Sequence, residues 1–363
     1  MSKLEIISIL ILVSSFAFSN CTIDKRPEYI NKIPDVESFT YIPIPDDNFE
    51  KGKVDLVPSL FITGTEQREN FISTPFWIEK ISNEIWIADP LKGEVIAFKK
   101  NGEFSRLIAT EGRGPGELQQ PAGIFYRNKH SEPSDSVWIL DSGLKSIISF
   151  SLNGEEIDRI HNELILSEFF NNRIIANQDN SFIVPLMNHK RHVLGVIDQN
   201  GDLVDSFVNR IVPLGYQPVT HNRLYYDIEF DSKKIVYAYH GLPLIFLEGL
   251  DQVNKNLFDF RPNIELRDYN ISLNPIPMEE RVSVKSIVRD LFIGGNKIYF
   301  RLENEIIILN YETGFVEHTI SLVDEEGFPM IFQQMIYSDG TFFLINRFTS
   351  DIFYFTEDDI SNL

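Results

Sequence analysis

The feature that most constrains the fold is an internal repeat. Residues 84–104 align with residues 136–156 without a gap, at a constant offset of 52 positions. The matched positions are two aromatic residues, an aspartate and an Asn-Gly pair: Trp86 and Trp138, Asp89 and Asp141, Phe98 and Phe150, and residues 101–102 and 153–154. Self-similarity at a fixed period of this length indicates a repeat architecture, a class that includes the β-propellers.

Each copy has the pattern of strands joined by tight turns. The runs IWIAD and VWILD are short and rich in β-branched and aromatic residues, as strands are. The Asn-Gly pairs favour hairpins because both residues tolerate positive φ. Weaker copies follow in further segments: 180–205, 234–250, 296–321 and 339–356. Four strands joined by hairpins make one propeller blade, so these copies predict six blades.

The two ends of the repeat region are complementary. The last copy ends with the chain and lacks an outer strand, whereas residues 59–70 resemble the outer strand of the first copy, from residue 105 onward. The N-terminal segment can therefore complete the last blade, which closes the ring and removes two exposed sheet edges. We predict an all-β, six-bladed β-propeller of four-stranded antiparallel blades over residues 49–363. Five or seven blades are the alternative, because the fourth copy is degenerate.

The N-terminus has the features of an export signal. An apolar run of 13 residues, from Ile6 to Phe18, is too short to span a bilayer but fits a signal-peptide core. It ends in the sequence FSNC, which resembles the bacterial lipoprotein processing box. We expect residues 1–20 to be a lipoprotein signal peptide and Cys21 to carry the lipid, on the outer membrane or periplasmic face of a bacterial cell envelope. Ordinary cleavage nearby and an uncleaved anchor are the alternatives.

The segment after the signal is rich in proline. Residues 21–48 contain prolines at positions 27, 34, 43 and 45. Proline interrupts regular helices and strands. We therefore expect residues 21–48 to be a lipidated N-terminus and a flexible tether that holds the propeller clear of a membrane surface.

The charge balance excludes one class of partner. The chain carries 33 basic and 53 acidic side chains, which gives a formal net charge of −20. Nucleic-acid phosphates require a positive surface, so we expect no nucleic-acid partner. The single cysteine excludes an internal disulfide framework and a multi-cysteine metal site. We expect a monomer that binds no metal and no cofactor.

A glycine-rich segment joins the first two blades. Its members are Gly112, Arg113, Gly114, Pro115, Gly116 and Glu117. The segment lacks the Lys-Ser/Thr pair of a phosphate-binding P-loop, and it opens no helix. Three glycines and a proline favour an irregular structural crossing near the central channel. Arg113 and Glu117 can still face a ligand from such a crossing.

The same segment carries a family resemblance. Together with Pro121, it is similar to the GxGPGEF-x-x-P-x-G-I segment of bacterial six-bladed β-propeller lipoproteins, which are related to NHL-repeat propellers. Leu118 replaces the usual Phe, and the run DSGLKSI at Asp141 also resembles the NHL blade core. The resemblance implies a six-bladed propeller in the cell envelope. It implies no particular activity, because most members of that group have no assigned biochemical role.

A polar and aromatic segment enters the fourth blade and is the second candidate region. The candidate binding residues, on the channel or loop face, are Arg113, Glu117, His221, Arg223, Tyr225 and Asp227.

Two other motifs have structural interpretations. Asp89 and Asp141 recur at one blade position, which favours caps of nearby backbone amides over channel-facing ligands. Residues 198–205 have carboxylates at calcium-loop spacing, but the repeat places a hairpin turn there.

The sequence gives no arrangement of residues that is diagnostic of catalysis. No Ser-His-Asp set can be picked out, because propeller loops bring distant residues together. We therefore predict a non-enzymatic binding or scaffold propeller that presents its loops to a protein, peptide or glycan. The alternative is an envelope enzyme that resembles NHL-type amidating lyases or calcium-dependent lactonases, with its site in the central channel.

Overall fold

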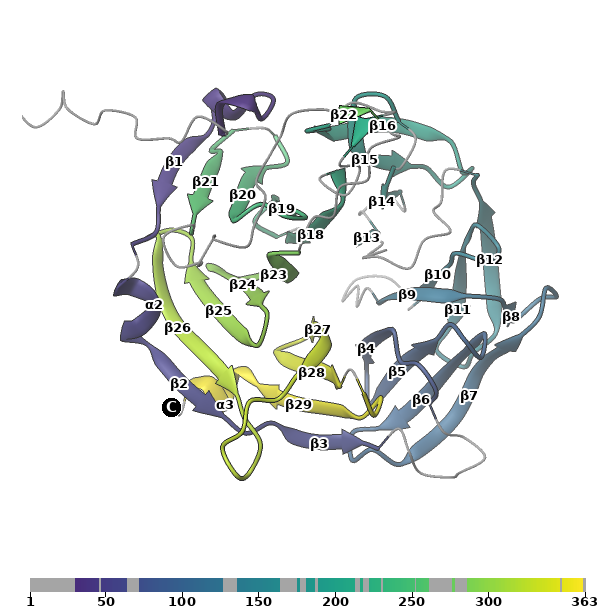
Figure 1. Ribbon diagram of the computed structural model, residues 1–363. Helices are drawn as coiled ribbons and strands as arrows, with labels where there is room; N and C mark the ends of the chain where they lie inside the picture. The colour runs from purple at the N-terminus through teal and green to yellow at the C-terminus, as the bar shows by residue number, and fades with distance from the viewer. Residues whose placement is uncertain are drawn as a thin grey trace, which may run out of the picture.

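Six mainly antiparallel β-sheets surround a central axis as the blades of a propeller (Figure 1). In this computed structural model the described residues are 30–45, 47–63, 72–126, 136–163, 175–176, 181–186, 189–212, 216–217, 222–229, 231–251, 253–260, 276–277, 286–346 and 348–361. Each blade has four or five strands, and the chain runs from the innermost strand outward before it enters the next blade. The six-bladed prediction is confirmed, and the five- and seven-bladed alternatives are wrong.

Blades 1 to 3 come from residues 77–209. Blade 1 comprises β4 (Trp77–Ile81), β5 (Glu84–Asp89), β6 (Glu94–Lys99), β7 (Phe104–Glu111) and the short parallel β8 (Glu117–Leu118). Blade 2 comprises β9 (Pro121–Tyr126), β10 (Ser136–Asp141), β11 (Ser146–Ser151) and β12 (Glu156–His161). Blade 3 comprises β13 (Ile175–Ala176), β14 (Phe182–Pro185), β15 (His192–Ile197) and β16 (Leu203–Asn209).

Blades 4 to 6 combine strands from both ends of the chain. Blade 4 contains β18 (Leu224–Glu229), β19 (Lys234–Tyr239), β20 (Leu244–Gly249) and β21 (Asn256–Asp259). Blade 5 contains β23 (Val288–Gly294), β24 (Lys297–Leu302), β25 (Glu305–Asn310) and β26 (Phe315–Leu322). Blade 6 contains β27 (Phe332–Ser338), β28 (Thr341–Asn346) and β29 (Ile352–Thr356), and its outer strand is β3 (Ser59–Ile62).

The N-terminal strand closes the ring, as the sequence predicts. β3 pairs antiparallel with β29, and Ile62 lies opposite Ile352. Phe61 packs edge-on against the rings of Phe343 and Tyr354, with ring centres 5.9 and 6.1 Å away. The ring is therefore closed by a sheet that joins residues from opposite ends of the chain.

Glycine is required in the outer hairpins of blades 1 to 3. Gly102, Gly154 and Gly201 have φ values of 81°, 88° and 87°. A Cβ atom at Gly102 would lie 2.3 Å from the carbonyl oxygen of Phe61, and one at Gly201 would lie 2.8 Å from that of His161. The Asn-Gly pairs that mark the repeat therefore allow both the turn and the close approach of each hairpin to the outer strand of the preceding blade.

Residues 30–62, here called the strap, run along the outside of blades 4 to 6 (Figure 1). The strap contains η1 (Ile30–Lys32), η2 (Val36–Ser38), β1 (Thr40–Pro43), α2 (Asp47–Lys51), β2 (Lys53–Leu56) and β3. β1 adds in parallel to the outer edge of β21, and β2 adds in parallel to β26. The strap thus covers sheet edges that would otherwise be exposed.

Apolar side chains at every third position hold the strap in place. Ile30, Ile33, Val36 and Phe39 are each at most 7% exposed. A 3₁₀-helix has three residues per turn, so these side chains share one side of the strap and join the core of blade 4. The flexible tether predicted for residues 21–48 is therefore wrong over 30–45, because the prolines exclude a long helix without preventing burial. Residues 1–29, which include Cys21, lie outside the described residues.

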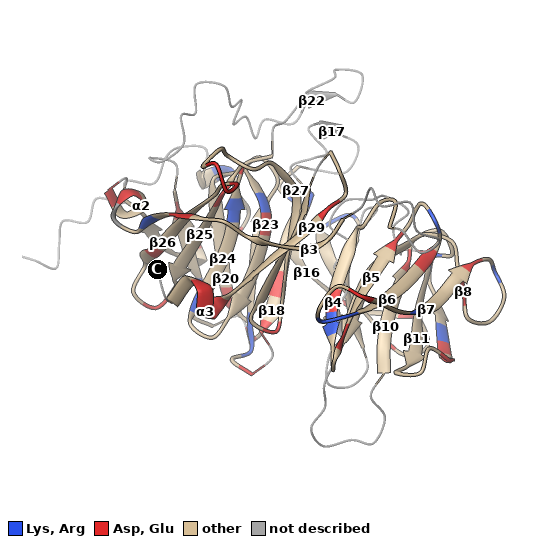
Figure 2. Ribbon diagram, turned by 90° about the horizontal axis from the view of Figure 1, so that it is seen from below, with Lys and Arg blue, Asp and Glu red and all other residues tan. Residues whose placement is uncertain are grey.

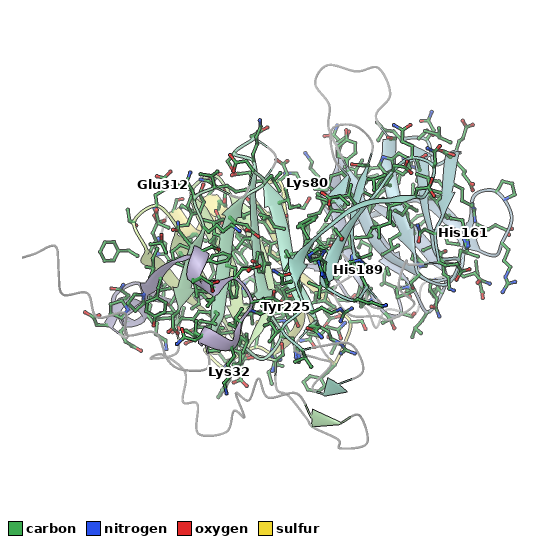
Figure 3. All side chains as sticks on the ribbon, turned by 90° about the horizontal axis from the view of Figure 1, so that it is seen from above. Lys32, Lys80, His161, His189, Tyr225 and Glu312 are labelled. Atoms are coloured by element: carbon green, nitrogen blue, oxygen red, sulfur yellow. The ribbon has the colours of Figure 1, made fainter. Side chains whose placement is uncertain are left out.

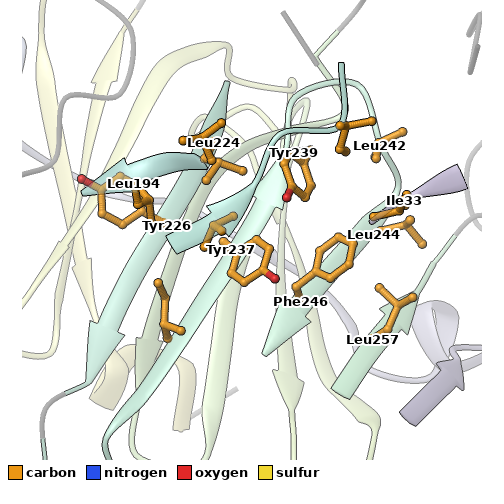
Figure 4. Close-up of a cluster of buried hydrophobic side chains, with 14 of the residues drawn as sticks. Ile33, Leu194, Leu224, Tyr226, Tyr237, Tyr239, Leu242, Leu244, Phe246 and Leu257 are labelled. Carbon is orange, nitrogen blue, oxygen red and sulfur yellow. The ribbon is translucent and has the colours of Figure 1, made fainter. Parts of the chain in front are cut away.

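The hydrophobic core lies between neighbouring blades. Figure 4 shows the part between blades 3 and 4, where Leu194 of β15 belongs to the same buried cluster as Tyr226 of β18. Trp86 is fully buried, and Trp138 packs edge-on against Phe182 of blade 3 with ring centres 4.7 Å apart. These two tryptophans therefore serve in packing between strands and blades.

Among the described residues, few lie outside the blades and the strap. β17 (Tyr216–Gln217) pairs with β22 (Ile276–Pro277), and this two-stranded ribbon projects from one face of the ring (Figure 2). The short α3 (Glu357–Ser361) follows β29, and its Glu357 carboxylate accepts hydrogen bonds from the hydroxyls of Tyr299 and Tyr337. Within the described part of the chain, helices long and apolar enough to cross a membrane are absent.

Candidate functional site

The glycine-rich loop between blades 1 and 2 lies at the outer rim. It follows β7, the fourth strand of blade 1, and its last residues form β8 on the outside of the ring (Figure 1). Glu117 folds the loop on itself, because its carboxylate accepts hydrogen bonds from the backbone amides of Arg113 and Gly114 at 2.8 and 2.7 Å. Glu156 accepts a further bond from the amide of Gly116. The expectation that this loop crosses near the central channel is therefore wrong.

Asp89 and Asp141 hold equivalent turns. The Asp89 carboxylate accepts bonds from the amides of Ser73 and Thr74, and the Asp141 carboxylate accepts bonds from the amides of Gln119, Gln120 and Leu144. Both aspartates are fully buried. Each one ties the connector that enters its blade to the blade's second strand, which is a structural use of the carboxylate.

The central channel has a narrow mouth at the start of the innermost strands. We define the channel mouth by Trp77 of β4, Tyr225 of β18, Asp290 of β23 and Gln334 of β27. Together with neighbouring residues of blades 4 to 6 they enclose a cavity of about 20 Å³. A cavity of this size admits one water molecule or one small chemical group. Figure 3 places Tyr225 near the middle of the molecule, far from His161 at the end of β12.

Two aromatic side chains give the channel mouth its polar character. Trp77 is 6% exposed, and its indole Nε1 is buried without a hydrogen-bond partner in the described structure. The Tyr225 hydroxyl lies 3.2 Å from the Ser286 hydroxyl. Burial raises the pKa of Tyr225, so its hydroxyl stays neutral and can donate a hydrogen bond at physiological pH.

A buried ion pair supports the mouth between blades 5 and 6. Arg301 is fully buried and donates from Nε to the Asp290 carboxylate at 2.5 Å. Its other nitrogens donate to the carbonyl oxygens of Phe332 and Gln333 in β27. Burial raises the pKa of Asp290 to about 6, against the opposing effect of Arg301. The pair therefore fixes the position of β27 relative to β23.

The structure separates the residues that the sequence proposes as one binding region. Tyr225 lines the channel mouth, and Arg223 directly precedes β18. Asp227 lies deeper in β18, and its carboxylate accepts bonds from the amides of Ile228 and Ile293, which links blade 4 to blade 5. Arg113 lies at the rim with Glu117, and His221 is outside the described residues.

The sequence interpretation missed Trp77, Gln334 and the Arg301–Asp290 pair. The signal that could have found three of them is their place in the strand. Trp77, Asp290 and Gln334 each lie within the first three residues of an innermost strand. That signal requires strand boundaries that the degenerate later copies do not reveal.

The described residues contain no group of three or more His, Cys, Asp or Glu side chains that could hold a metal ion. The hairpin interpretation of Asp198 is confirmed, because it accepts bonds from the amides of Asn200 and Asp202.

Solved structures share the fold of this chain at low sequence identity. A Bacteroides fragilis protein inferred to be exported is 12% identical, with a TM-score of 0.51 over 87% of this chain and 99% of that chain. A DUF4221 family member from Bacteroides vulgatus is 12% identical, with a TM-score of 0.53 over 83% and 94%. A Bacteroides thetaiotaomicron protein of unknown function is 10% identical, with a TM-score of 0.52 over 82% and 74%.

The family is shown by a match to the sequence itself. The search of curated proteins found no match. The DUF5128 family, described as a 6-bladed beta-propeller, matches residues 55–239, which is half of the chain. This supports the six-bladed part of the resemblance, whereas the NHL relationship stays a prediction. The chain therefore belongs to the DUF5128 family of six-bladed β-propellers.

Proposed function

We propose that the protein is an exported lipoprotein of the bacterial cell envelope whose propeller binds a protein, peptide or glycan and catalyses no reaction. The apolar run before Cys21 and the FSNC sequence support export and lipid attachment. Export also agrees with the description of the Bacteroides fragilis protein of the same fold. The lipid on Cys21 would hold the propeller at a membrane surface.

The observation that carries the binding proposal is the buried indole Nε1 of Trp77, which has no hydrogen-bond partner among the described residues. Buried donors in native proteins are nearly always paired, so a donor left without a partner calls for an acceptor from outside the chain. Tyr225 lies beside it with a neutral hydroxyl. The cavity of about 20 Å³ admits only the tip of a ligand, so the rest of the ligand would lie on the loop face around the channel mouth.

Trp77→Phe tests the proposal, because it keeps an aromatic ring and removes the donor. The full-length chain in detergent is screened against immobilised glycans and peptides, and each hit is titrated by calorimetry. We expect Trp77→Phe to weaken binding about tenfold, the effect of one hydrogen bond of about 1.4 kcal/mol. Trp138→Phe, in blade 2, is the matched control and should leave binding unchanged.

The same titrations can contradict the proposal. If every hit binds the Trp77→Phe and Trp138→Phe proteins equally, the ligand does not use the Trp77 donor and the channel mouth is not the binding site. A Tyr225→Phe variant that also binds normally would lead to the same conclusion. Melting temperatures of all three variants show whether each one is folded.

A further inference from the structure

A second, much larger cavity lies between blades 3 and 4, under the strap. We call it the inter-blade pocket. Its volume is about 440 Å³, which is within the range of sites for small ligands. Its walls come from the strap at Asp35 and Phe39, from blade 3 at Asp205, and from blade 4 at Phe246, Glu248 and Lys255. It shares no lining residue with the channel mouth.

Aromatic rings form one wall of the inter-blade pocket. Tyr237 and Phe246 are stacked, with ring centres 5.0 Å apart and an interplanar angle of 2°. Phe39 of the strap meets Phe246 edge-on at 5.3 Å. Figure 4 shows Tyr237 and Phe246 side by side in blade 4. The faces of such rings carry partial negative charge and attract cations.

The pocket already holds one ammonium group of the chain itself. The Lys255 Nζ atom lies 3.1 Å from the Glu248 carboxylate and 5.3 Å from the centre of the Phe39 ring. Glu248 is 8% exposed, so this carboxylate and ring form a partly desolvated site. The Glu248 carboxylate and the Phe39 ring therefore already bind one cation, the ammonium group of Lys255. Proteins bind organic cations with the same geometry.

The remaining charge of the pocket is negative. Asp35 and Asp205 are exposed and line it from the strap and from β16, and no cationic side chain of the described residues forms an ion pair with either. Asp35 accepts a hydrogen bond from the Asn209 amide, and Asp205 accepts one from the backbone amide of Ser206. His192 also lines the pocket, and burial lowers its pKa, so it adds little positive charge at neutral pH.

We propose that the inter-blade pocket binds an organic cation, a ligand that carries an ammonium or guanidinium group. The cation lies between Asp35 and Asp205 and against the aromatic wall. Free polyamines and the basic side chains of peptides offer the same chemistry. This site does not depend on the channel mouth, so it remains if the function proposed above fails.

Calorimetry on the full-length chain in detergent tests the proposal with defined probes. Spermidine represents a free amine, and the capped tripeptides Ala-Lys-Ala and Ala-Arg-Ala represent basic side chains. Capped Ala-Gln-Ala is the neutral control. We expect saturable binding of at least one cationic probe and none of the neutral peptide, and the stronger of the two cationic classes identifies the source of the ligand.

Matched variants locate the bound cation. Asp35→Asn and Asp205→Asn should each weaken binding about twofold to fivefold, the effect of one exposed ion pair. Phe39→Leu should weaken it about threefold through loss of the ring face. Asp202→Asn removes an exposed carboxylate of the same hairpin as Asp205 that does not line the pocket, so it should have little effect. Trp77→Phe should also leave cation binding unchanged.

Three outcomes would overturn the proposal. The first is equal binding of Ala-Gln-Ala and the basic peptides. The second is a loss for Asp202→Asn as large as that for Asp35→Asn, because the acidic surface as a whole would then explain the binding. The third is the absence of saturable binding for every cationic probe. Melting curves confirm that each variant is folded.

Discussion

At the scale of single residues, buried polar side chains in this propeller hold backbone groups of a neighbouring segment. Asp141 binds three amides, Asp227 reaches from blade 4 to blade 5, and Asp290 reaches from blade 5 to blade 6. A buried backbone amide without a partner costs about 1–3 kcal/mol, so these carboxylates contribute to stability through the amides that they satisfy. Because a buried donor needs an acceptor, the Trp77 indole Nε1, which has no partner among the described residues, is the basis of the binding proposal.

The Arg301–Asp290 pair gives a prediction that depends on pH. Burial raises the pKa of Asp290 to about 6, above the ordinary 3.8, so the folded protein holds this proton more tightly than the unfolded chain. The stabilising contribution of the protonated carboxyl is present at low pH. It falls as the pH rises from the ordinary pKa of 3.8 through the folded-state pKa of about 6. Arg301→Met raises this pKa further and leaves a buried unpaired charge at neutral pH. We expect it to lower the free energy of unfolding by about 3–5 kcal/mol at pH 8 and by less at pH 5.

Urea unfolding at the two pH values measures this difference. Lys99→Met is the control, because the Lys99–Glu103 pair is exposed and should be worth about 1 kcal/mol or less. Equal losses for Arg301→Met at pH 5 and pH 8 would show that Asp290 does not take up the proton.

At the scale of elements, the repeat predicts strands and hairpins well and the strap poorly. The Asn-Gly pairs lie at the hairpins with positive φ, as their residue types predict. The repeat does not predict the elements of the strap, because they are short and belong to no repeat. The apolar residues at the start of the strap recur at every third position, a period that matches neither the 3.6 residues of an α-helical turn nor the two-residue repeat of a strand.

Gly102 gives a prediction about the hairpins. Gly102→Ala combines a left-handed φ of 81° with a Cβ position 2.3 Å from the Phe61 carbonyl oxygen. Gly116→Ala has a similar φ of 76°, but its Cβ would meet no atom within 4 Å. Strain in φ alone is about 1–2 kcal/mol. We therefore expect Gly102→Ala to lower the melting temperature clearly more than Gly116→Ala, and similar effects would contradict the contact with β3.

Ile30 gives a prediction about the strap. Ile30→Ala removes a fully buried side chain and should lower the free energy of unfolding by about 2–4 kcal/mol. Val57→Ala is the matched control within the strap, because Val57 is 52% exposed and its truncation should have little effect. Chemical denaturation compares the two. A neutral Ile30→Ala would mean that the strap does not pack on blade 4.

At the scale of the whole molecule, the N-terminal segment runs along the outer edge of blades 4 to 6 before the first blade begins. The strap lies outside blades 4 to 6, and its last strand completes blade 6 before blade 1 begins. Because the strap starts at Ile30, few residues separate the proposed lipid at Cys21 from the packed fold. A propeller anchored in this way would lie close to the membrane surface.

Anchoring gives a prediction for the whole molecule. Cys21→Ser should move the protein from the membrane fraction to the soluble envelope fraction, because the lipid could no longer be attached. Ser19→Thr, in the same processing sequence, keeps the cysteine and serves as the control. Cell fractionation followed by immunoblotting measures the distribution. A Cys21→Ser protein that stays with the membranes through detergent-free washes would show that another feature anchors it.

By itself the sequence determined the class of fold and the closure of the ring, and it favoured six blades over five or seven. These features follow from the repeat, whose two clearest copies are 52 residues apart, and from the complementary ends of the repeat region. Tertiary structure alone decided which side chains meet. Trp77, Tyr225 and Gln334 come together because a closed ring brings the starts of its innermost strands to one axis, and no spacing in the sequence encodes that meeting. The glycine-rich loop lies at the rim for the converse reason: its blade position, rather than its composition, sets its distance from the axis.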